Sequence, residues 1–239
     1  MSAIEERLKI VKGNIAKACC RANRDPDYVR LVVVTKSAQP GEIEHVVKLG
    51  CTDLGESRVQ HLRLIADQLN QDLEKSDNQR LVGQIRWHMI GHLQRNKVKH
   101  TLDLCHIIHS VDTLRLAEEI DTAAAKKHLH CSVLMQVNCS KEPQKYGVPV
   151  GAAIHLAEQI ASMPHLRLEG LMTMAPLTMD KNIVHDCFIR CRELFEEIRA
   201  EKITGSRFCH LSMGMSQDYE IAVECGATLL RIGSAIFAG

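Results

Sequence analysis

LVVVTK, residues 31–36, is the stretch from which we infer the fold. Its apolar, mostly β-branched residues are typical of a short strand that is buried on both faces of a sheet. Lys36 follows where that strand ends, Pro40 then begins a helix, and Gly50 suits the end of that helix. A lysine at the carboxyl end of a buried strand is unusual, because burying an ammonium group is costly.

Lys36 has two interpretations at this point. Its side chain can extend from the strand end into solvent, which is the commoner behaviour of an isolated lysine. Alternatively, its amine can lose its proton and attack an aldehyde, as Schiff-base lysines do. The stretch by itself favours the first interpretation, and only residues elsewhere in the chain can distinguish the two.

The composition is that of a globular protein without a charge signature. The chain has 239 residues, of which 45% are hydrophobic and 25% charged, and its net charge is +1. We therefore expect neither a nucleic-acid nor a membrane partner, and the basic stretch 93–100 is interpreted as a solvated helix. No apolar run reaches membrane-spanning length, and the charged, amphipathic start is unlike a signal peptide, which predicts a cytoplasmic protein.

The ten cysteines are not arranged as a disulfide or metal framework. The chain contains no C-x-x-C pair, and we expect no export signal. Cys187 and Cys191 lie four residues apart near His185, but a structural zinc site usually needs four ligands at a recognisable spacing. We therefore predict no metal.

Strand and helix patterns alternate along the whole chain. A capping box at Ser2 and Glu5 begins an additional helix at the N-terminus. Further helices are predicted to be capped by Asp112, Asp180 and Ser216, and the polar stretch 70–80 is predicted to be a surface loop. The predicted strands are 30–36, 51–57, 86–92, 106–111, 131–138, a strand within 166–174, 210–214 and the beginning of 228–237.

About eight βα units in a chain of this length predict a TIM (β/α)8 barrel with an extra N-terminal helix, forming a single domain over residues 1–239. A doubly wound sheet is the alternative, but no GxGxxG follows the first strand. The barrel places Lys36, Ser57 and Asn138 at the ends of strands one, two and five. Residues 212–216 and 231–234 follow strands seven and eight, where such barrels often bind phosphate. An amine opposite a phosphate cradle suits a phosphorylated aldehyde such as pyridoxal 5'-phosphate (PLP).

Five motifs together resemble the pyridoxal phosphate homeostasis protein family, a single-domain relative of the alanine racemase barrel. They are VVVTK, LGESRVQ, WHMIGHLQRNK, LEGLMTMAP and HLSMGMSQDYEIAVECGATLLRIGSAIF, and the resemblance covers nearly the whole chain.

The resemblance implies a fold-type III PLP site. It implies that Lys36 holds PLP as a reversible Schiff base and that Arg231 lies against the pyridine nitrogen. Ser57 stands where many members have asparagine. The phosphate is expected to be held, partly through backbone amides, by Ser212, Met213, Gly233 and Ser234.

The same resemblance implies a role in vitamin B6 and amino-acid homeostasis, without an established catalytic activity. The racemases complete their site with a β-rich domain and a dimer partner, and here the barrel is expected to use all the residues. We therefore expect a monomeric PLP carrier, with apo PLP-dependent enzymes as possible recipients, and assign no catalytic residue. The alternatives are a PLP-dependent amino-acid racemase with an unrecognised substrate and a barrel enzyme that binds another phosphorylated ligand.

Overall fold

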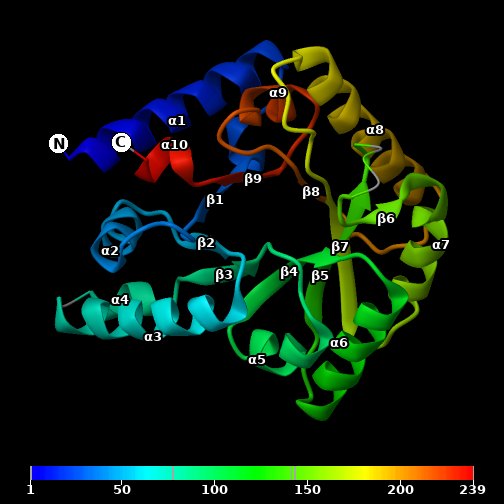
Figure 1. Cartoon of the computed structure of the whole chain (residues 1–239), viewed down its shortest axis with the longest axis horizontal. Helices are drawn as coiled ribbons and strands as arrows, with labels where there is room; N and C mark the ends of the chain where they lie inside the picture. The colour runs from blue at the N-terminus through cyan, green and yellow to red at the C-terminus, as the bar shows by residue number, and fades with distance from the viewer. Residues whose placement is uncertain (1, 77, 141, 143, 239) are drawn as a thin grey trace.

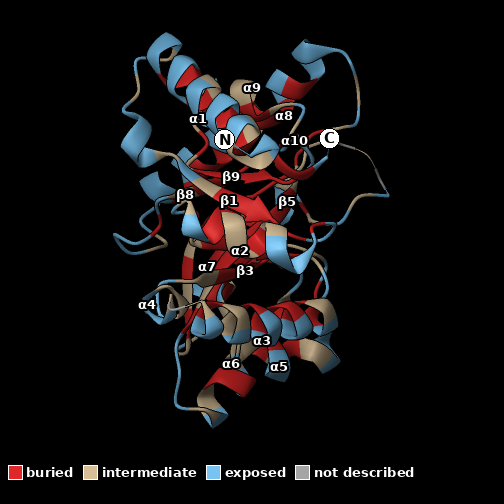
Figure 2. Cartoon of the chain, turned by 90° about the vertical axis from the view of Figure 1, so that its left-hand side faces the viewer, coloured by how far each residue is buried: buried red, intermediate tan, exposed pale blue. Residues whose placement is uncertain are grey.

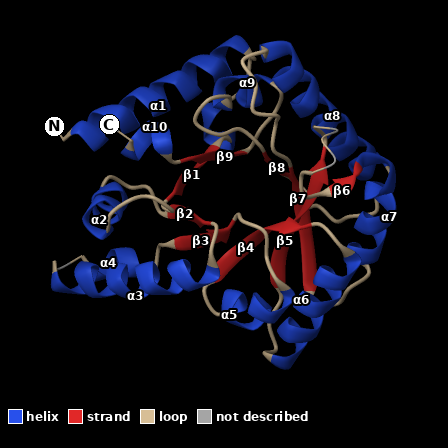
Figure 3. Cartoon of the chain, in the orientation of Figure 1, coloured by secondary structure: helices blue, strands red, loops and turns tan. Residues whose placement is uncertain are grey.

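Eight parallel strands close into a ring, with helices around the outside (Figures 1 and 3). The computed structural model describes residues 2–76, 78–140, 142 and 144–238. Within these residues the ring runs β4-β3-β2-β1-β9-β8-β7-β5 and is closed by pairing of β4 with β5. The strands are β1 (Arg30–Val34), β2 (Asp53–Glu56), β3 (Arg86–Met89), β4 (Cys105–Val111), β5 (Cys131–Asn138), β7 (Leu166–Met172), β8 (His210–Ser212) and β9 (Leu229–Ile232). A two-residue strand, β6 (Val148–Pro149), pairs with the end of β5.

The helices cover the outside of the ring, so the parallel strands are buried as this arrangement requires. They are α1 (Ala3–Arg21), α2 (Pro40–Lys48), α3 (Val59–Lys75), α4 (Gln79–Val82), α5 (Val98–Leu102), α6 (Leu114–Lys126), α7 (Val150–Ala161), α8 (Lys181–Ala200), α9 (Tyr219–Glu224) and α10 (Ser234–Phe237). Single turns of 3₁₀ helix lie at Pro26–Tyr28 and Arg95–Lys97. None of the helices in the described residues is long and apolar enough to cross a lipid bilayer.

Figure 2 shows that the strands and the inward faces of the helices are buried, and the apolar interior has two parts. The larger part lies mainly between the strands and the helices. The smaller part consists of the buried residues Val32, Ile107, Leu134, Met172 and Leu229. Alternate strand residues point to opposite sides of the ring, so this smaller cluster shares the barrel interior with the polar residues described below.

The predicted barrel and its extra N-terminal helix are confirmed. Ser2 and Glu5 form the predicted capping box at the start of α1, and Asp180 accepts from the N–H of Asn182 at the start of α8. The extra helix packs beside α9 and α10 (Figure 1). Arg7 Nε of this helix donates to the carbonyl oxygen of Ile236 at 2.7 Å.

Several local predictions were wrong. Residues 70–80 are mostly helical, because the buried Leu73 extends the apolar face of α3 by another turn. Thr113, not Asp112, caps α6 by accepting from the N–H of Leu116. Ser216 does not cap α9, which begins after Asp218. Three strands end earlier than predicted, since β1 ends at Val34, β3 at Met89 and β8 at Ser212 instead of at residues 36, 92 and 214. The second strand spans Asp53–Glu56 instead of 51–57.

Candidate functional site

Four neighbouring strands carry all the predicted cofactor-binding residues at or just beyond their carboxyl ends. These strands are consecutive in the ring, in the order β2-β1-β9-β8. The carboxyl ends of parallel strands share one edge of a barrel, which is where barrel sites are built. The residues in question are Ser57 after β2, Lys36 after β1, Arg231, Gly233 and Ser234 on or after β9, and Ser212 and Met213 on or after β8.

Lys36 lies two residues beyond β1 and is solvent-exposed. The segment that follows β9 approaches the end of β1 very closely. A Cβ atom at Gly233 would lie 2.9 Å from the carbonyl oxygen of Val34 and 3.1 Å from its Cβ. Only glycine permits this approach, and it brings the segment that leads into Ser234 against the strand that leads into Lys36.

Glu56 links the ends of β1 and β2, and sequence reasoning did not identify it. Its carboxylate is fully buried, and it accepts from Thr35 Oγ1 at 3.1 Å and from the Ser57 N–H at 2.7 Å. His61 Nδ1 lies 2.7 Å from Glu56 Oε2. These contacts fix the backbone where β1 leads into Lys36 and β2 leads into Ser57. The available signal was an acidic residue at the carboxyl end of the predicted second strand, next to Ser57.

Arg231 points from β9 into the barrel and is only 4% exposed. Its Nη1 donates to Ser212 Oγ at 2.5 Å, and its Nη2 donates to the carbonyl oxygen of Thr173 at 2.9 Å. Burial lowers the pKa of Arg231 to about 10, with the negative charge of Asp218 acting in the opposite direction. The guanidinium therefore remains a cation at neutral pH, held in place by β7 and β8.

Ser212 and Met213 have their donors engaged within the protein. Ser212 Oγ lies between Arg231 and His109 Nδ1, which is 2.9 Å away. Met213 is fully buried, and its N–H donates to the carbonyl oxygen of Leu229 at 3.2 Å. The exposed hydroxyl on this side of the opening is that of Ser234. Sequence position alone could not separate Ser234 from Ser212, because both lie at the carboxyl end of a strand of the same rim.

The opposite side of the rim is formed by residues after β3, β4 and β5. His92 stacks on Tyr146, with the ring centroids 4.1 Å apart, and His92 Nδ1 lies 3.7 Å from the Asp112 carboxylate. Burial raises the pKa of Asp112. Asn138 uses its side-chain amide within its own loop, donating to the carbonyl oxygen of Glu142 at 2.8 Å. These residues shape the opening, and Asn138 is engaged locally.

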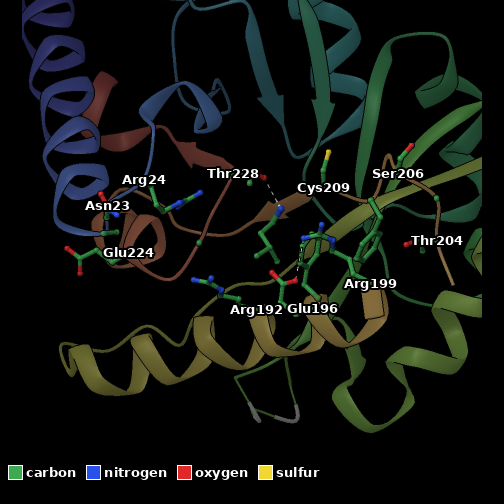
Figure 4. A pocket seen from close by; sticks show the side chains of 16 residues that line it. Asn23, Arg24, Arg192, Glu196, Arg199, Thr204, Ser206, Cys209, Glu224 and Thr228 are labelled. Carbon is green, nitrogen blue, oxygen red and sulfur yellow. Dashed lines mark hydrogen bonds and ion pairs between the residues drawn. The ribbon is translucent and has the colours of Figure 1, made fainter. Parts of the chain in front are cut away.

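A cavity of about 650 Å³ lies at the other end of the barrel (Figure 4). It is lined by the end of α1, the last turns of α8 and the segments that lead into β8 and β9. Arg24, which lines it, is held by the carbonyl oxygens of Val223 and Ala227. Residues at the amino ends of barrel strands usually serve stability, and none of the predicted cofactor-binding residues lies in this cavity.

The rim of β2, β1, β9 and β8 therefore presents a primary amine, a buried guanidinium and a hydroxyl beside a close glycine contact. The amine can bond to an aldehyde carbon, the guanidinium can donate to a ring nitrogen, and hydroxyl and backbone N–H groups can bind a phosphate. This donor set fits a small phosphorylated aromatic aldehyde.

Comparisons with known proteins agree on one family. The family model described as "Alanine racemase, N-terminal domain" matches residues 7–239. A pyridoxal phosphate homeostasis protein of Aquifex aeolicus is 37% identical over 232 residues, covering 97% of this chain and 96% of the relative.

Two solved structures are similar over nearly their whole length. An unknown protein from Bifidobacterium adolescentis has a TM-score of 0.90 and 32% identity, covering 98% of this chain and 94% of that one. PipY of Synechococcus elongatus, in a structure with PLP bound, has a TM-score of 0.81 and 28% identity, covering 98% of this chain and 100% of that one.

Proposed function

This chain belongs to the pyridoxal phosphate homeostasis protein family, and from that premise we propose that it binds PLP at the carboxyl ends of β2, β1, β9 and β8. The observation that supports the proposal is the adjacency of these four strands, in which Gly233, the residue before Ser234, packs against Val34, two residues before the exposed Lys36. The PLP-bound structure of its relative PipY supports the same ligand.

Lys36 is the residue that holds the cofactor covalently. Its neutral amine adds to the aldehyde carbon and one water molecule leaves, so the bond forms without any other reactant and is reversed by water or by another amine. The exposure of Lys36 suits exchange, because an amine at the surface can be reached by incoming ligand.

The remaining rim residues hold the two ends of the ligand. Ser234 and the backbone at Gly233 bind the phosphate, and Arg231 faces the ring nitrogen from the barrel interior. Ser57 contributes at the side of the ring. Ser212 and Met213 support the site through other residues. Ser212 accepts a hydrogen bond from Arg231, and the N–H of Met213 donates to the carbonyl oxygen of Leu229 on β9.

The role proposed is holding and releasing PLP within the cytoplasm, as a monomer, with apo PLP-dependent enzymes as recipients. When bound, PLP supplies an aldehyde and an electron-withdrawing ring. A cationic Arg231 beside the ring nitrogen disfavours a proton on that nitrogen, which weakens electron withdrawal from a substrate carbon. This electrostatic effect favours storage of the cofactor over turnover of amino acids.

The test is reduction of the PLP-loaded protein with borohydride, followed by mass spectrometry of its peptides. We expect the reduced cofactor on Lys36 and none in Lys36→Ala, with the exposed Lys17→Ala as the matched control that keeps the label. Labelling spread over several lysines would contradict a defined site.

A second measurement separates the carrier from an enzyme. The loaded protein is incubated with both enantiomers of a panel of amino acids, and racemisation or elimination is followed over time. Slow release of PLP to the amino acid is expected, whereas turnover at an enzymatic rate of about 1 per second or faster would show that the protein is an enzyme.

A further inference from the structure

A continuous line of buried side chains crosses the barrel interior behind Arg231. Asp53 Oδ1 lies 2.9 Å from His88 Nε2, and His88 Nδ1 lies 2.9 Å from His109 Nε2. His109 Nδ1 lies 2.9 Å from Ser212 Oγ, which accepts from Arg231 Nη1 at 2.5 Å. We refer to Asp53, His88, His109 and Ser212 as the relay.

The relay connects strands on different sides of the ring. Asp53 lies on β2, His88 on β3 and His109 on β4, and the last step crosses to Ser212 on β8. All four residues are buried, with exposed fractions between 0% and 5%. In the described chain, the buried side-chain nitrogen and oxygen atoms without a partner belong to other residues, namely Arg86, Ser110, Glu142, His165 and His210.

One end of the relay can only accept hydrogen bonds. Arg86 Nη2 donates to Asp53 Oδ2 at 2.6 Å, and Arg30 Nε lies 3.8 Å from the same oxygen. Burial opposes ionisation of Asp53, but the hydrogen bonds from His88 and Arg86 hold its pKa below its usual value. An ionised carboxylate has no proton to donate, so His88 Nε2 must be the donor.

Arg231, which contacts the other end of the relay at Ser212, can only donate, because a guanidinium has no acceptor atom. With both imidazoles neutral, one assignment satisfies every bond. His88 Nε2–H donates to Asp53, His109 Nε2–H donates to His88 Nδ1, and the Ser212 hydroxyl donates to His109 Nδ1. Ser212 Oγ is then free to accept from Arg231. Burial lowers the pKa of both imidazoles, which agrees with their neutral forms.

We propose that Asp53, His88 and His109 are positioning residues that hold Arg231 through Ser212, in a relay with a single direction of hydrogen bonding. Because the Ser212 proton is used towards His109, the Ser212 oxygen accepts from Arg231. This bond fixes the position of the guanidinium at the carboxyl end of the barrel. The part of this inference that concerns PLP rests on the proposed function, whereas the direction of the relay does not.

The direction is measured by long-range ¹⁵N NMR of the ligand-free protein labelled on histidine, with His88→Gln and His109→Gln used for assignment. We expect both imidazoles to be neutral and protonated on Nε2. A proton on Nδ1 of either ring, or a cationic ring, would overturn the relay. This measurement needs no bound ligand, so it decides the direction even if the protein does not bind PLP.

Asp53→Asn tests the cause of the direction. Because Arg86 only donates, the new amide oxygen faces Arg86 and the NH₂ group faces His88 Nε2, which must then accept. We expect both imidazoles to change to the Nδ1–H tautomer, so that Ser212 Oγ faces two donors and its own proton loses its acceptor. The exposed Asp103→Asn is the matched control and should leave the tautomers unchanged. Unchanged tautomers in Asp53→Asn would contradict the proposal.

PLP affinity tests the consequence. We expect Asp53→Asn to weaken PLP binding on the order of tenfold, because the buried Ser212 hydroxyl is left with its proton unpaired and holds Arg231 less firmly. Ser212→Ala should weaken PLP binding by a similar factor, while both imidazoles keep their Nε2–H tautomers. If Asp53→Asn does not fold, Ser212→Ala provides the test of PLP affinity in its place. A change of tautomer with unchanged affinity would show that the relay does not position Arg231 for the ligand.

Discussion

The backbone N–H of Ala235 donates to Ser216 Oγ at 3.1 Å, and this bond joins the loop after β8 to the first turn of α10 after β9. Ser216 was expected to cap the following helix, but its hydroxyl instead stabilises a neighbouring segment of the rim. The proposed phosphate side of the site is therefore built from two loops that hold each other.

Ser216→Ala should loosen this side of the rim. Removing the hydroxyl leaves the Ala235 N–H without its acceptor and should lower the free energy of unfolding by about 1 kcal/mol. Urea unfolding measures this loss, and PLP titration should show weaker binding. The control is Ser162→Ala, because it removes an exposed hydroxyl at the end of α7 and none from the rim. Equal stability of the two variants would contradict a structural role for Ser216.

Ser234→Ala should weaken PLP binding by about 1–2 kcal/mol, because it removes a charge-assisted hydrogen bond to the phosphate. Equilibrium titration measures the effect, with the exposed Ser206→Ala at the other end of the barrel as the control. Unchanged affinity would mean that backbone amides hold the phosphate without the hydroxyl.

Gly214→Ala should destabilise the protein by about 2–4 kcal/mol. Gly214 has a φ of +93°, and a Cβ there would lie 2.5 Å from the Cβ of Ala222. Gly13 offers a matched control, because it is within α1 and a Cβ there would meet nothing within 4 Å. Gly13→Ala should raise the free energy of unfolding by about 0.5–1 kcal/mol. The same sign for both variants in urea unfolding would refute this account.

Stability should fall as the pH falls below about 6.5, the ordinary pKa of histidine. Burial holds the pKa of His88 and of His109 below that value in the folded state. The unfolded chain therefore binds more protons than the folded protein in this range, and each histidine contributes up to about 1.4 kcal/mol per pH unit. The charged and titratable groups around the two rings are Arg30, Asp53, His106, His210 and Arg231.

Urea unfolding between pH 5 and 8 measures this dependence. His109→Gln should reduce the slope below pH 6.5, whereas the exposed His155→Gln should leave it unchanged. A slope that is the same in His109→Gln and in the unmodified protein would show that the buried histidine does not cause it.

Local sequence signals accounted for the elements and for the placement of the rim residues. The β-branched run before Lys36, the capping box at Ser2 and the cap at Asp180 act over a few residues, and the structure confirms all three elements. Errors arose where a local signal competed with packing. Leu73 continues the buried face of α3 through a stretch whose polar composition suggests a loop.

By itself, the sequence determined the alternation of strands and helices, and therefore the barrel and the end at which Lys36, Arg231 and Ser234 lie. Only the tertiary structure decided how these residues are held. The contact of Gly233 with Val34 and the step of the relay from His109 to Ser212 join strands that are distant in the chain, and Glu56 is buried between the ends of β1 and β2. Their partners are selected by the curvature and register of the closed ring, and neither property is encoded in a local pattern of residues.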